Sequence, residues 1–408
     1  MTTNQTIDYA ANGPLPLLRI IDRQGPQSQR GLARKLGLTF AGVSFHLKKM
    51  HSDRMVRKFS KPATQKRGRP SITWDMDRVK NCTLGIVIAP PEMEMSMCDF
   101  ADNVILQETQ RLGRKTSLEN IVAAMDRFIA ASIEQAGKNR SKIRQVFVGV
   151  PGHLDAETGR IIDCPNLPAL DGMDFEEHIQ TRFGLKTMVQ AANYAVYAGE
   201  IDRFGRDTVG MLITWELGLG VLFGCNEDIY NFLGQSGEKY RGLWDIGHMR
   251  IAKGGKVCKC GKRGCLEAYA GGWAMLEQTK KKLDSLDEFI ALAKNGNSAV
   301  LKIFRVSAKL LGKQLAGLVE LMGIEKIVIA GPLAEIFDLA RDDFNAGLCN
   351  LLDANDVSAL SATASTDSQV RAAIGAGRIA KFAFLYPEAL LERRKNMARS
   401  YRDNSRPS

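Results

Sequence analysis

The first forty residues alternate apolar and polar positions in a way that predicts two short helices. Apolar side chains recur between Leu15 and Ile21 and predict a helix that ends near Gly25. Ser28 stands where a residue capping the next helix is expected, and Gly37 provides the tight turn that ends this second helix. The spacing therefore predicts two helices that are joined through a short connection.

A third helix and a hairpin are predicted next. Thr39 can cap a helix over residues 39–51, in which Val43, Leu47 and Met50 recur at helical spacing and predict a buried face. Residues 55–59 and 72–74 read as two strands on either side of a basic loop. Three helices with a glycine-containing turn before the third, followed by a hairpin, are typical of a winged helix-turn-helix.

From about residue 82 the pattern changes to alternating strands and helices, which predicts an α/β body. Its length suggests two lobes with a cleft between them. We predict a division into residues 1–80, the head and its linker; residues 81–390, the body; and residues 391–408, a basic polar tail. Strands are expected at 84–89, 145–150, 208–215 and 326–331, and long helices at 119–137 and 298–323.

Charge separates the same two regions. The entire net charge of +11 lies in residues 1–80, which hold 16 Lys and Arg against 5 Asp and Glu. Residues 81–408 hold 40 basic and 40 acidic residues. A basic N-terminal region favours a polyanionic partner, double-stranded DNA above all, although a solvated basic surface is the alternative. No run of about 18 apolar residues and no secretory signal are present, so we expect a cytoplasmic protein that associates with the nucleoid rather than with a membrane.

Three of the eight cysteines crowd into eight residues, Cys258, Cys260 and Cys265, with glycines between them. Thiolates that converge in this way predict a Zn²⁺ site, which needs a fourth ligand. His248, ten residues before the first of these cysteines, is the nearest histidine. A chance cluster or a redox pair is the alternative.

This stretch also carries a family resemblance. Asp-Ile-Gly-His at 245–248, followed by Cys-x-Cys-Gly-x-x-Gly-Cys-x-Glu at 258–267, resembles the signature of the ROK family of repressors, open reading frames and sugar kinases. The stretches 149–152 and 164–168 are similar to a second family segment, and Gly-Arg-Pro at 68–70 resembles the linker of the repressor branch, which includes xylose and N-acetylglucosamine repressors. The resemblance spans nearly the whole chain.

The resemblance implies an α/β fold in which a winged helix-turn-helix precedes a two-lobed, actin-like and sugar-kinase-like body of the ATPase fold. It also implies two sets of site residues. The implied zinc ligands are His248, Cys258, Cys260 and Cys265. The residues implied to line a sugar pocket are Asn166, Asp245, His248 and Glu267.

The chain differs from the family's kinases at the positions that, in those kinases, bind phosphate or accept the proton of the sugar hydroxyl. The first phosphate turn reads Val-Ile-Ala-Pro-Pro at 87–91, without a carboxylate for Mg²⁺ and with prolines that lack N–H donors. The second phosphate turn begins with Glu216, which would repel a phosphate. The family's Asn-Asp pair is replaced by Ala191 and Ala192. We therefore expect no enzyme activity. The two alanines also leave one side of the pocket apolar, so the ligand need not be an ordinary sugar.

We expect the helix over 39–51 to enter the major groove of DNA. Phe40 and Phe45 could instead pack inside the head, and the Lys-Arg-Gly-Arg-Pro linker is either a minor-groove hook or an ordinary basic segment. The expected DNA-binding residues are Thr39, Phe40, Ala41, Ser44, Phe45, Lys48, Arg67 and Arg69.

Together these observations predict a DNA-binding transcription regulator. We expect it to repress carbohydrate genes, to sense a sugar or sugar derivative, and to form a homodimer or homotetramer. Two alternatives stay open. One is a sugar kinase with a DNA-binding head, and the other is a regulator that docks another protein without any ligand in its cleft.

Overall fold

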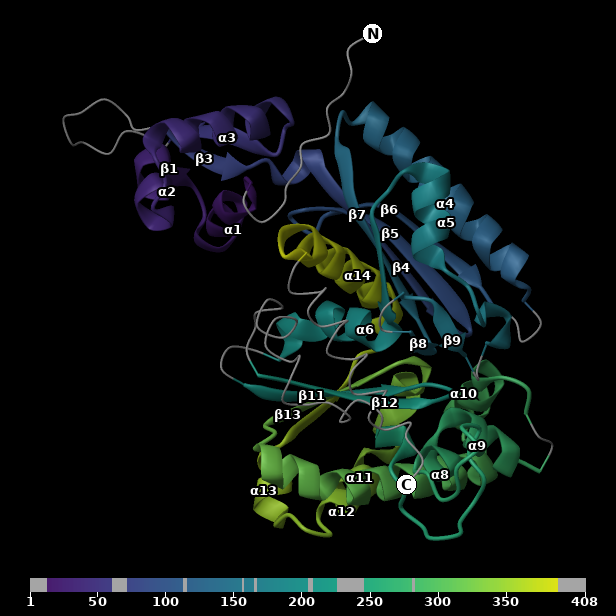
Figure 1. Cartoon of the computed structure of the whole chain (residues 1–408). Helices are drawn as coiled ribbons and strands as arrows, with labels where there is room; N and C mark the ends of the chain where they lie inside the picture. The colour runs from purple at the N-terminus through teal and green to yellow at the C-terminus, as the bar shows by residue number, and fades with distance from the viewer. Residues whose placement is uncertain are drawn as a thin grey trace, which may run out of the picture.

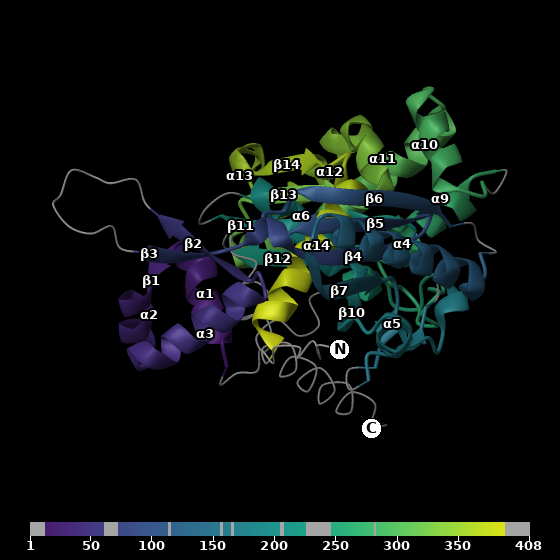
Figure 2. The same cartoon turned by 90° about the horizontal axis from the view of Figure 1, so that it is seen from above.

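The computed structural model describes residues 13–60, 72–112, 116–155, 158–164, 167–204, 208–225, 246–280 and 283–387. Figure 1 shows a small N-terminal region beside two lobes, each built around a sheet, and Figure 2 shows that this region projects from one side of them. In the described part of the chain, no helix combines the length and the apolar character that a membrane crossing requires.

The N-terminal region, residues 13–60 and 72–80, is called the head below. Its elements follow the order that the hydrophobic pattern predicts, with a short additional strand before the second helix. They are α1 (Leu15–Gln24), β1 (Gln27–Ser28), α2 (Gln29–Leu36), α3 (Phe40–Ser52), β2 (Val56–Ser60) and β3 (Ile72–Met76), with the strands in the order β1-β3-β2. Ser28 and Thr39 accept hydrogen bonds from the backbone N–H groups of Gly31 and Gly42, both at 3.1 Å, so both predicted caps are confirmed.

The core of the head is shared with the body. Val43, Leu47 and Met50 are fully buried, as their spacing predicts. The same cluster includes Phe100 and Leu385, which belong to the body by sequence. The head therefore packs directly on the body and is not held by its linker alone.

The first lobe is a mixed five-stranded sheet in the order β10-β7-β4-β5-β6, with helices on both faces. Its strands are β4 (Asn81–Ala89), β5 (Glu92–Asp99), β6 (Val104–Arg111), β7 (Lys142–Val150) and β10 (Thr187–Ala191). Helices α4 (Leu118–Lys138) and α5 (Phe175–Phe183) cover one face and enclose one hydrophobic core. The small elements of this lobe are β8 (His153–Leu154), β9 (Ile161–Asp163) and η2 (Pro168–Leu170), and η1 (Arg78–Lys80) connects it to the head.

The second lobe is a four-stranded sheet in the order β12-β11-β13-β14. Its strands are β11 (Val209–Trp215), β12 (Leu219–Cys225), β13 (Lys326–Ala330) and β14 (Ser361–Ala364). The long helix α11 (Ser298–Met322) and its neighbours bury the largest core of the molecule against this sheet. These neighbours are η4 (Ile246–His248), α8 (Glu267–Ala270), α9 (Gly272–Gln278), α10 (Leu286–Lys294), η5 (Pro332–Ala340), α12 (Arg341–Leu348) and α13 (Ala354–Ala359).

Two helices, α6 (Ala192–Glu200) and α14 (Ser368–Leu385), lie between the two sheets and pack on each other (Figure 1). The two helices approach each other closely because glycines lie at their interface. A Cβ atom on Gly199 would lie 2.2 Å from the carbonyl oxygen of Arg371, and one on Gly375 would lie 2.0 Å from that of Ala195. Larger residues would force these helices, and with them the two lobes, apart.

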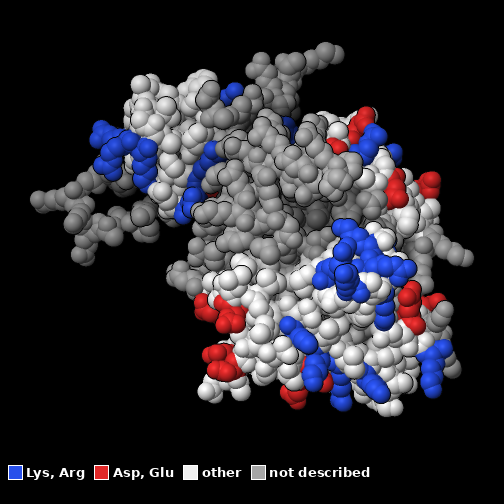
Figure 3. Space-filling view, turned by 60° about the horizontal axis from the view of Figure 1, so that its bottom comes forward, with Lys and Arg blue, Asp and Glu red and all other residues white. Residues whose placement is uncertain are grey.

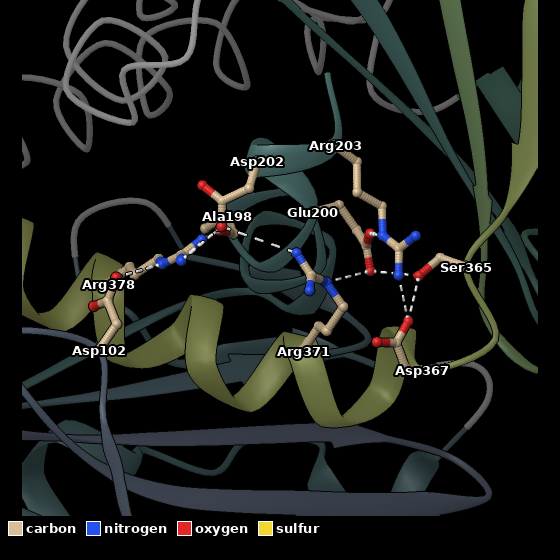
Figure 4. Close-up of polar contacts among 9 residues, drawn as sticks. All are labelled: Asp102, Ala198, Glu200, Asp202, Arg203, Ser365, Asp367, Arg371 and Arg378. Carbon is tan, nitrogen blue, oxygen red and sulfur yellow. Dashed lines mark hydrogen bonds and ion pairs between the residues drawn. The ribbon is translucent and has the colours of Figure 1, made fainter. Parts of the chain in front are cut away.

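An ionic network fastens the two helices to the lobes (Figure 4). Glu200 is fully buried, lies 2.6 Å from the guanidinium of Arg203, and accepts a hydrogen bond from Ser365 at 2.7 Å. Further along α14, Arg378 donates to Asp102 at 2.9 Å and to Asp202 at 2.8 Å. Buried charges of this kind hold their elements in one geometry because separating one partner leaves the other unpaired.

Candidate ligand and metal site

Four metal-binding side chains converge at the edge of the second lobe. The ligand atoms of His248, Cys258, Cys260 and Cys265 all lie within 4.8 Å of one another. The Sγ atom of Cys258 is 3.5 Å from Nδ1 of His248, and the Sγ atoms of Cys260 and Cys265 are 3.8 Å apart. A tetrahedral ion with bonds of about 2.3 Å to sulfur and about 2.0 Å to nitrogen requires edges of about 3.8 Å and about 3.5 Å. The four residues predicted as ligands therefore fit one tetrahedral metal ion.

Two glycines allow the backbone to curl around this point. Gly261 and Gly264 have φ angles of 81° and 82°, in the left-handed region that favours glycine. A Cβ atom on Gly264 would also lie only 1.8 Å from the carbonyl oxygen of Ala252. The turn is closed by a backbone hydrogen bond of 2.8 Å from Cys258 to Lys262, which brings the thiol groups to the same side.

Burial works against thiolate formation in the metal-free site. It raises the pKa of the Cys258 thiol to about 12 and also raises the pKa of Cys265. A bound cation supplies the positive charge that stabilises the thiolates, so metal binding here releases protons.

Glu267, two residues after the last cysteine, is held between this site and strand β12. Its Oε2 accepts a hydrogen bond from the backbone N–H of Leu219 at 3.1 Å, and its Oε1 accepts one from Trp273 Nε1 at 2.9 Å. The residue is 7% exposed. Both oxygens retain lone pairs, so a carboxylate fixed in this way can also accept hydrogen bonds from a ligand.

A cavity of about 320 Å³ lies between the lobes beside this carboxylate. Glu267, His248 and Cys260 are in its wall, so the metal site and the predicted ligand site share one side of the cleft. Asn166 and Asp245, the other two predicted ligand-binding residues, lie outside the described residues. The other residues of the wall are Ala89, Val150, Pro151, Gly152, Ala191, Ala192, Asn193, Val196, Thr214, Glu216, Gly218, Leu219, Gly220 and Lys259.

The head presents the predicted DNA-facing side of α3 to solvent. Phe40 is 55% exposed and Phe45 is 64% exposed, so the alternative that they pack inside the head is wrong. Thr39, Ala41 and Lys48 are also exposed, and Ser44 is half-buried. Arg67 and Arg69 lie outside the described residues. Figure 3 shows basic side chains on the head and on the second lobe.

Sequence comparison assigns the family. The sequence profile of the ROK family matches residues 91–382, which is well over half of the chain. The chain belongs to the ROK family.

Relatives with related sequences include regulators and a kinase. The DNA-binding transcriptional repressor Mlc of Escherichia coli K12 is 24% identical over 340 residues, which cover 79% of this chain and 81% of Mlc. The dual regulator NagC of the same strain is 22% identical and covers 78% of this chain and 79% of NagC. A glucokinase of Streptomyces coelicolor is 25% identical and covers 64% of this chain and 84% of that enzyme.

Solved structures confirm the ROK fold. A ROK family transcriptional regulator described as a homologue of the E. coli Mlc protein superposes with a TM-score of 0.69 at 17% identity, covering 93% of this chain and 98% of that chain. A ROK glucokinase from Streptomyces griseus, in complex with glucose and AMPPNP, superposes with a TM-score of 0.59 at 20% identity, covering 74% of this chain and 99% of that one. The two-lobed α/β body predicted from the sequence is thus confirmed.

The cleft of this ROK protein brings together the positions at which its sequence departs from the family's kinases. Ala89, the two alanines at 191 and 192, and Glu216 all line the cavity. Pro90 and Pro91 form the turn between β4 and β5. Burial raises the pKa of Glu216 to about 7. This side of the cleft therefore combines apolar groups with one desolvated carboxyl.

Sequence reasoning missed three polar residues of the cavity wall, Asn193, Thr214 and Lys259. Asn193 follows the two alanines directly, and this adjacency is a signal that could have identified it. Thr214 lies on β11, next to the predicted second turn. Lys259 lies between two cysteines of the metal site, and its ammonium is 5.3 Å from the centre of the Trp273 ring.

Proposed function

We propose that this ROK protein is a DNA-binding transcription regulator, a repressor of carbohydrate genes. In this proposal residues 1–80 form a winged helix-turn-helix domain and linker, residues 81–390 form a sensing body, and residues 391–408 form a basic tail. The observation that carries the proposal is the exposed face of α3, where Phe40, Phe45 and Lys48 point to solvent in the region that holds the entire net charge of the chain.

The comparisons support this organisation. Mlc and NagC are named as regulators, and a solved ROK regulator covers 93% of this chain whereas the glucokinase covers 74%. We infer further that the protein acts on DNA in the cytoplasm, at the nucleoid, as a homodimer or homotetramer. Two heads would then reach two half-sites on one face of the duplex.

We assign Zn²⁺ to the site of His248, Cys258, Cys260 and Cys265. All four ligand atoms are nitrogen or sulfur, and the distances of 3.5 Å and 3.8 Å between two pairs of them match the edges of a tetrahedral site. All four positions being filled by protein atoms suits a structural metal rather than a catalytic one. Bound there, Zn²⁺ would fix the loop from which Glu267 extends and thereby position that carboxylate.

We infer that the body does not phosphorylate sugars. No side-chain carboxylate occupies position 191 or 192, where family kinases carry the group that accepts the sugar's proton. The turn at Pro90 and Pro91 lacks backbone N–H donors, and Glu216 places a carboxyl at the second phosphate turn. These are three separate losses, and each one on its own would impair phosphoryl transfer.

Helix α14 provides a route by which a sugar or sugar derivative in the cleft can act on the head. At its start, Ser368 accepts a hydrogen bond at 2.9 Å from the N–H of Gly331, which contacts the Glu216 side chain. At its end, Leu385 lies in the core of the head, and its carbonyl oxygen accepts a hydrogen bond at 2.7 Å from Arg19. A ligand that favours one degree of lobe closure would thus shift the position of the head.

The test is selection of duplexes from genomic DNA, followed by measurement of affinity as a function of salt. We expect a selective complex at moderate salt. The slope of log affinity against log salt concentration is negative. Lys48→Ala should make it shallower by about 0.9, the value for one phosphate contact in duplex DNA. Lys302→Ala, which removes an exposed helical lysine far from the head, is the matched control and should leave the slope unchanged. Absence of any sequence-selective complex would contradict the proposal.

A further inference from the structure

Glu216 lines the cleft with a carboxyl group that has no partner among the residues that the structure describes. Its backbone is held firmly, since its N–H donates to Gly218 at 3.1 Å and its carbonyl oxygen accepts from Gly272 at 2.9 Å. Its side chain makes neither a hydrogen bond nor an ion pair with any residue that the structure describes. The side chain keeps some accessible surface, and because Glu216 lines two cavities, this surface faces the inside of the cleft rather than the solvent.

The second of these cavities offers little solvation. Its volume is about 10 Å³, which is enough for about one water molecule. Its wall contains two further carboxyl groups, Glu92 and Glu94 from the first lobe, and among the described residues of this wall there is no Lys, Arg or His. Glu94 is 5% exposed and accepts hydrogen bonds from Thr109 at 2.9 Å. Acidic residues from both lobes therefore line this narrow space, although its accessible lining is almost entirely apolar.

The larger cavity has two basic residues in its described wall, and both have other roles. His248 belongs to the metal site. Lys259 extends over the Trp273 ring, with its ammonium 5.3 Å from the ring centre. Neither residue forms an ion pair with Glu216, so the charged nitrogen atoms of both lie more than 4 Å from its carboxyl oxygens. No described Lys, Arg or His therefore forms an ion pair with Glu216, which stands at the position of the second phosphate turn of family kinases.

We propose that the ligand of this cleft carries a protonated amine, and that the carboxylate of Glu216, in the wall of the larger cavity, binds it from the second lobe. The inference depends on the proposed function only in taking the cleft as a ligand site. A carboxylate held away from water gains most from an opposite charge, because the low local dielectric strengthens their attraction. The same carboxylate disfavours a phosphorylated group in this part of the cleft.

An ammonium group can be presented by an amino sugar or by a linear amine, and calorimetry on the full-length protein distinguishes these sources. The probes are glucosamine, N-acetylglucosamine, glucose 6-phosphate and spermidine. Glucosamine and N-acetylglucosamine share one ring and differ at a single nitrogen, which is charged only in the first. We expect at least one of the two amines to bind at least tenfold more tightly than both N-acetylglucosamine and glucose 6-phosphate, and the stronger amine identifies the source.

Glu216→Gln keeps the shape of the side chain and removes its charge, so it should abolish this preference. The matched control is Glu320→Gln, which changes an exposed carboxyl on α11 outside the cleft and should preserve the preference. The inference is overturned if neither amine binds, if the neutral or the phosphorylated sugar binds more tightly than both amines, or if Glu216→Gln retains the preference.

A parallel DNA-binding measurement without ligand separates the two proposals. Selective DNA binding without any amine preference would overturn this inference and leave the proposed function intact. An amine preference that depends on Glu216, in a protein that binds no DNA selectively, would support the inference and overturn the proposed function.

Discussion

The two sides of the cleft differ in how their polar groups are paired. On the metal side, Glu267 is fixed by two hydrogen bonds and its loop ends in four converging metal ligands. On the opposite side, two alanines and a pair of prolines stand where family kinases have catalytic and phosphate-binding groups, and Glu216 has no partner among the described residues. The same cleft therefore holds one carboxyl group that is fixed by hydrogen bonds and one that makes none with the described residues.

Removal of a metal ligand should have the largest effect in this comparison. Cys265→Ser is expected to eliminate bound zinc and to lower the free energy of unfolding by roughly 4 kcal/mol, since loss of a structural metal is among the most destabilising single changes. Elemental analysis and thermal denaturation measure the two effects. Cys349→Ser, at an exposed cysteine outside the cluster, is the control and should change neither. A wild-type protein that is equally stable after complete removal of metal would show that the site does not support the fold.

Glu267→Ala should have the second largest effect on stability. The substitution leaves the N–H of Leu219 and the indole N–H of Trp273 without their acceptor in a buried place. Each unpaired donor costs about 1–3 kcal/mol, so we expect a loss of roughly 3 kcal/mol in denaturant unfolding. Glu277→Ala removes an exposed carboxyl from the neighbouring helix α9 and should cost little. Equal stability of the two variants would mean that the carboxylate does not hold β12 against the metal loop.

Glu216 should make stability depend on pH in the opposite sense to a salt-bridged acid. Burial raises its pKa from 4.5 to about 7 in the folded protein, so the folded state favours the protonated form. Its contribution is therefore most favourable below pH 4.5 and is lost as the pH rises through about 7. Because the side chain retains some accessible surface, we expect the loss to be roughly 2 kcal/mol.

The measurement compares wild type with Glu216→Gln by chemical unfolding without ligand at pH 5, 6, 7 and 8. The stability of wild type relative to the variant should fall over this range and level off above pH 7. A difference between the two proteins that is constant across all four pH values would show that Glu216 titrates normally.

The smallest effect is expected from restoring a single catalytic group. Ala192→Asp returns a carboxylate to the cavity wall, but the turn at Pro90 and Pro91 and the carboxyl of Glu216 stay as they are. We expect no ATP-dependent phosphorylation of glucose, N-acetylglucosamine or xylose above background for either wild type or variant. Turnover by wild type that disappears in Glu267→Gln would identify the protein as a kinase and contradict the proposed loss of activity.

Local sequence patterns were sufficient for the elements whose two sides differ in polarity. The buried face of α3 at Val43, Leu47 and Met50, its cap at Thr39 and the left-handed turn at Gly37 all agree with the prediction, because each depends on residues within one or two turns of a helix. The metal ligands were predictable for the same reason, since three of them lie within eight residues.

Elements buried on every side escaped prediction. Strand β5 alternates Met93, Met95 and Met97 with polar residues, yet the polar side is buried as well, and Ser96 donates to the carbonyl oxygen of Ala373 at 2.8 Å. Helices α6 and α14 are rich in alanine and glycine and show no distinct apolar face, because each contacts the other helix and a sheet.

By itself the sequence therefore determined the order of the head's elements, the family, and the cluster of one histidine and three cysteines that the structure brings together. The tertiary structure decided that Phe40 and Phe45 are exposed, that Phe100 and Leu385 complete the core of the head, and that Glu216 and Glu94, from different lobes, line one small cavity. These last features join residues far apart in the chain, and their energies depend on burial and on the distance between charges, neither of which a local pattern records.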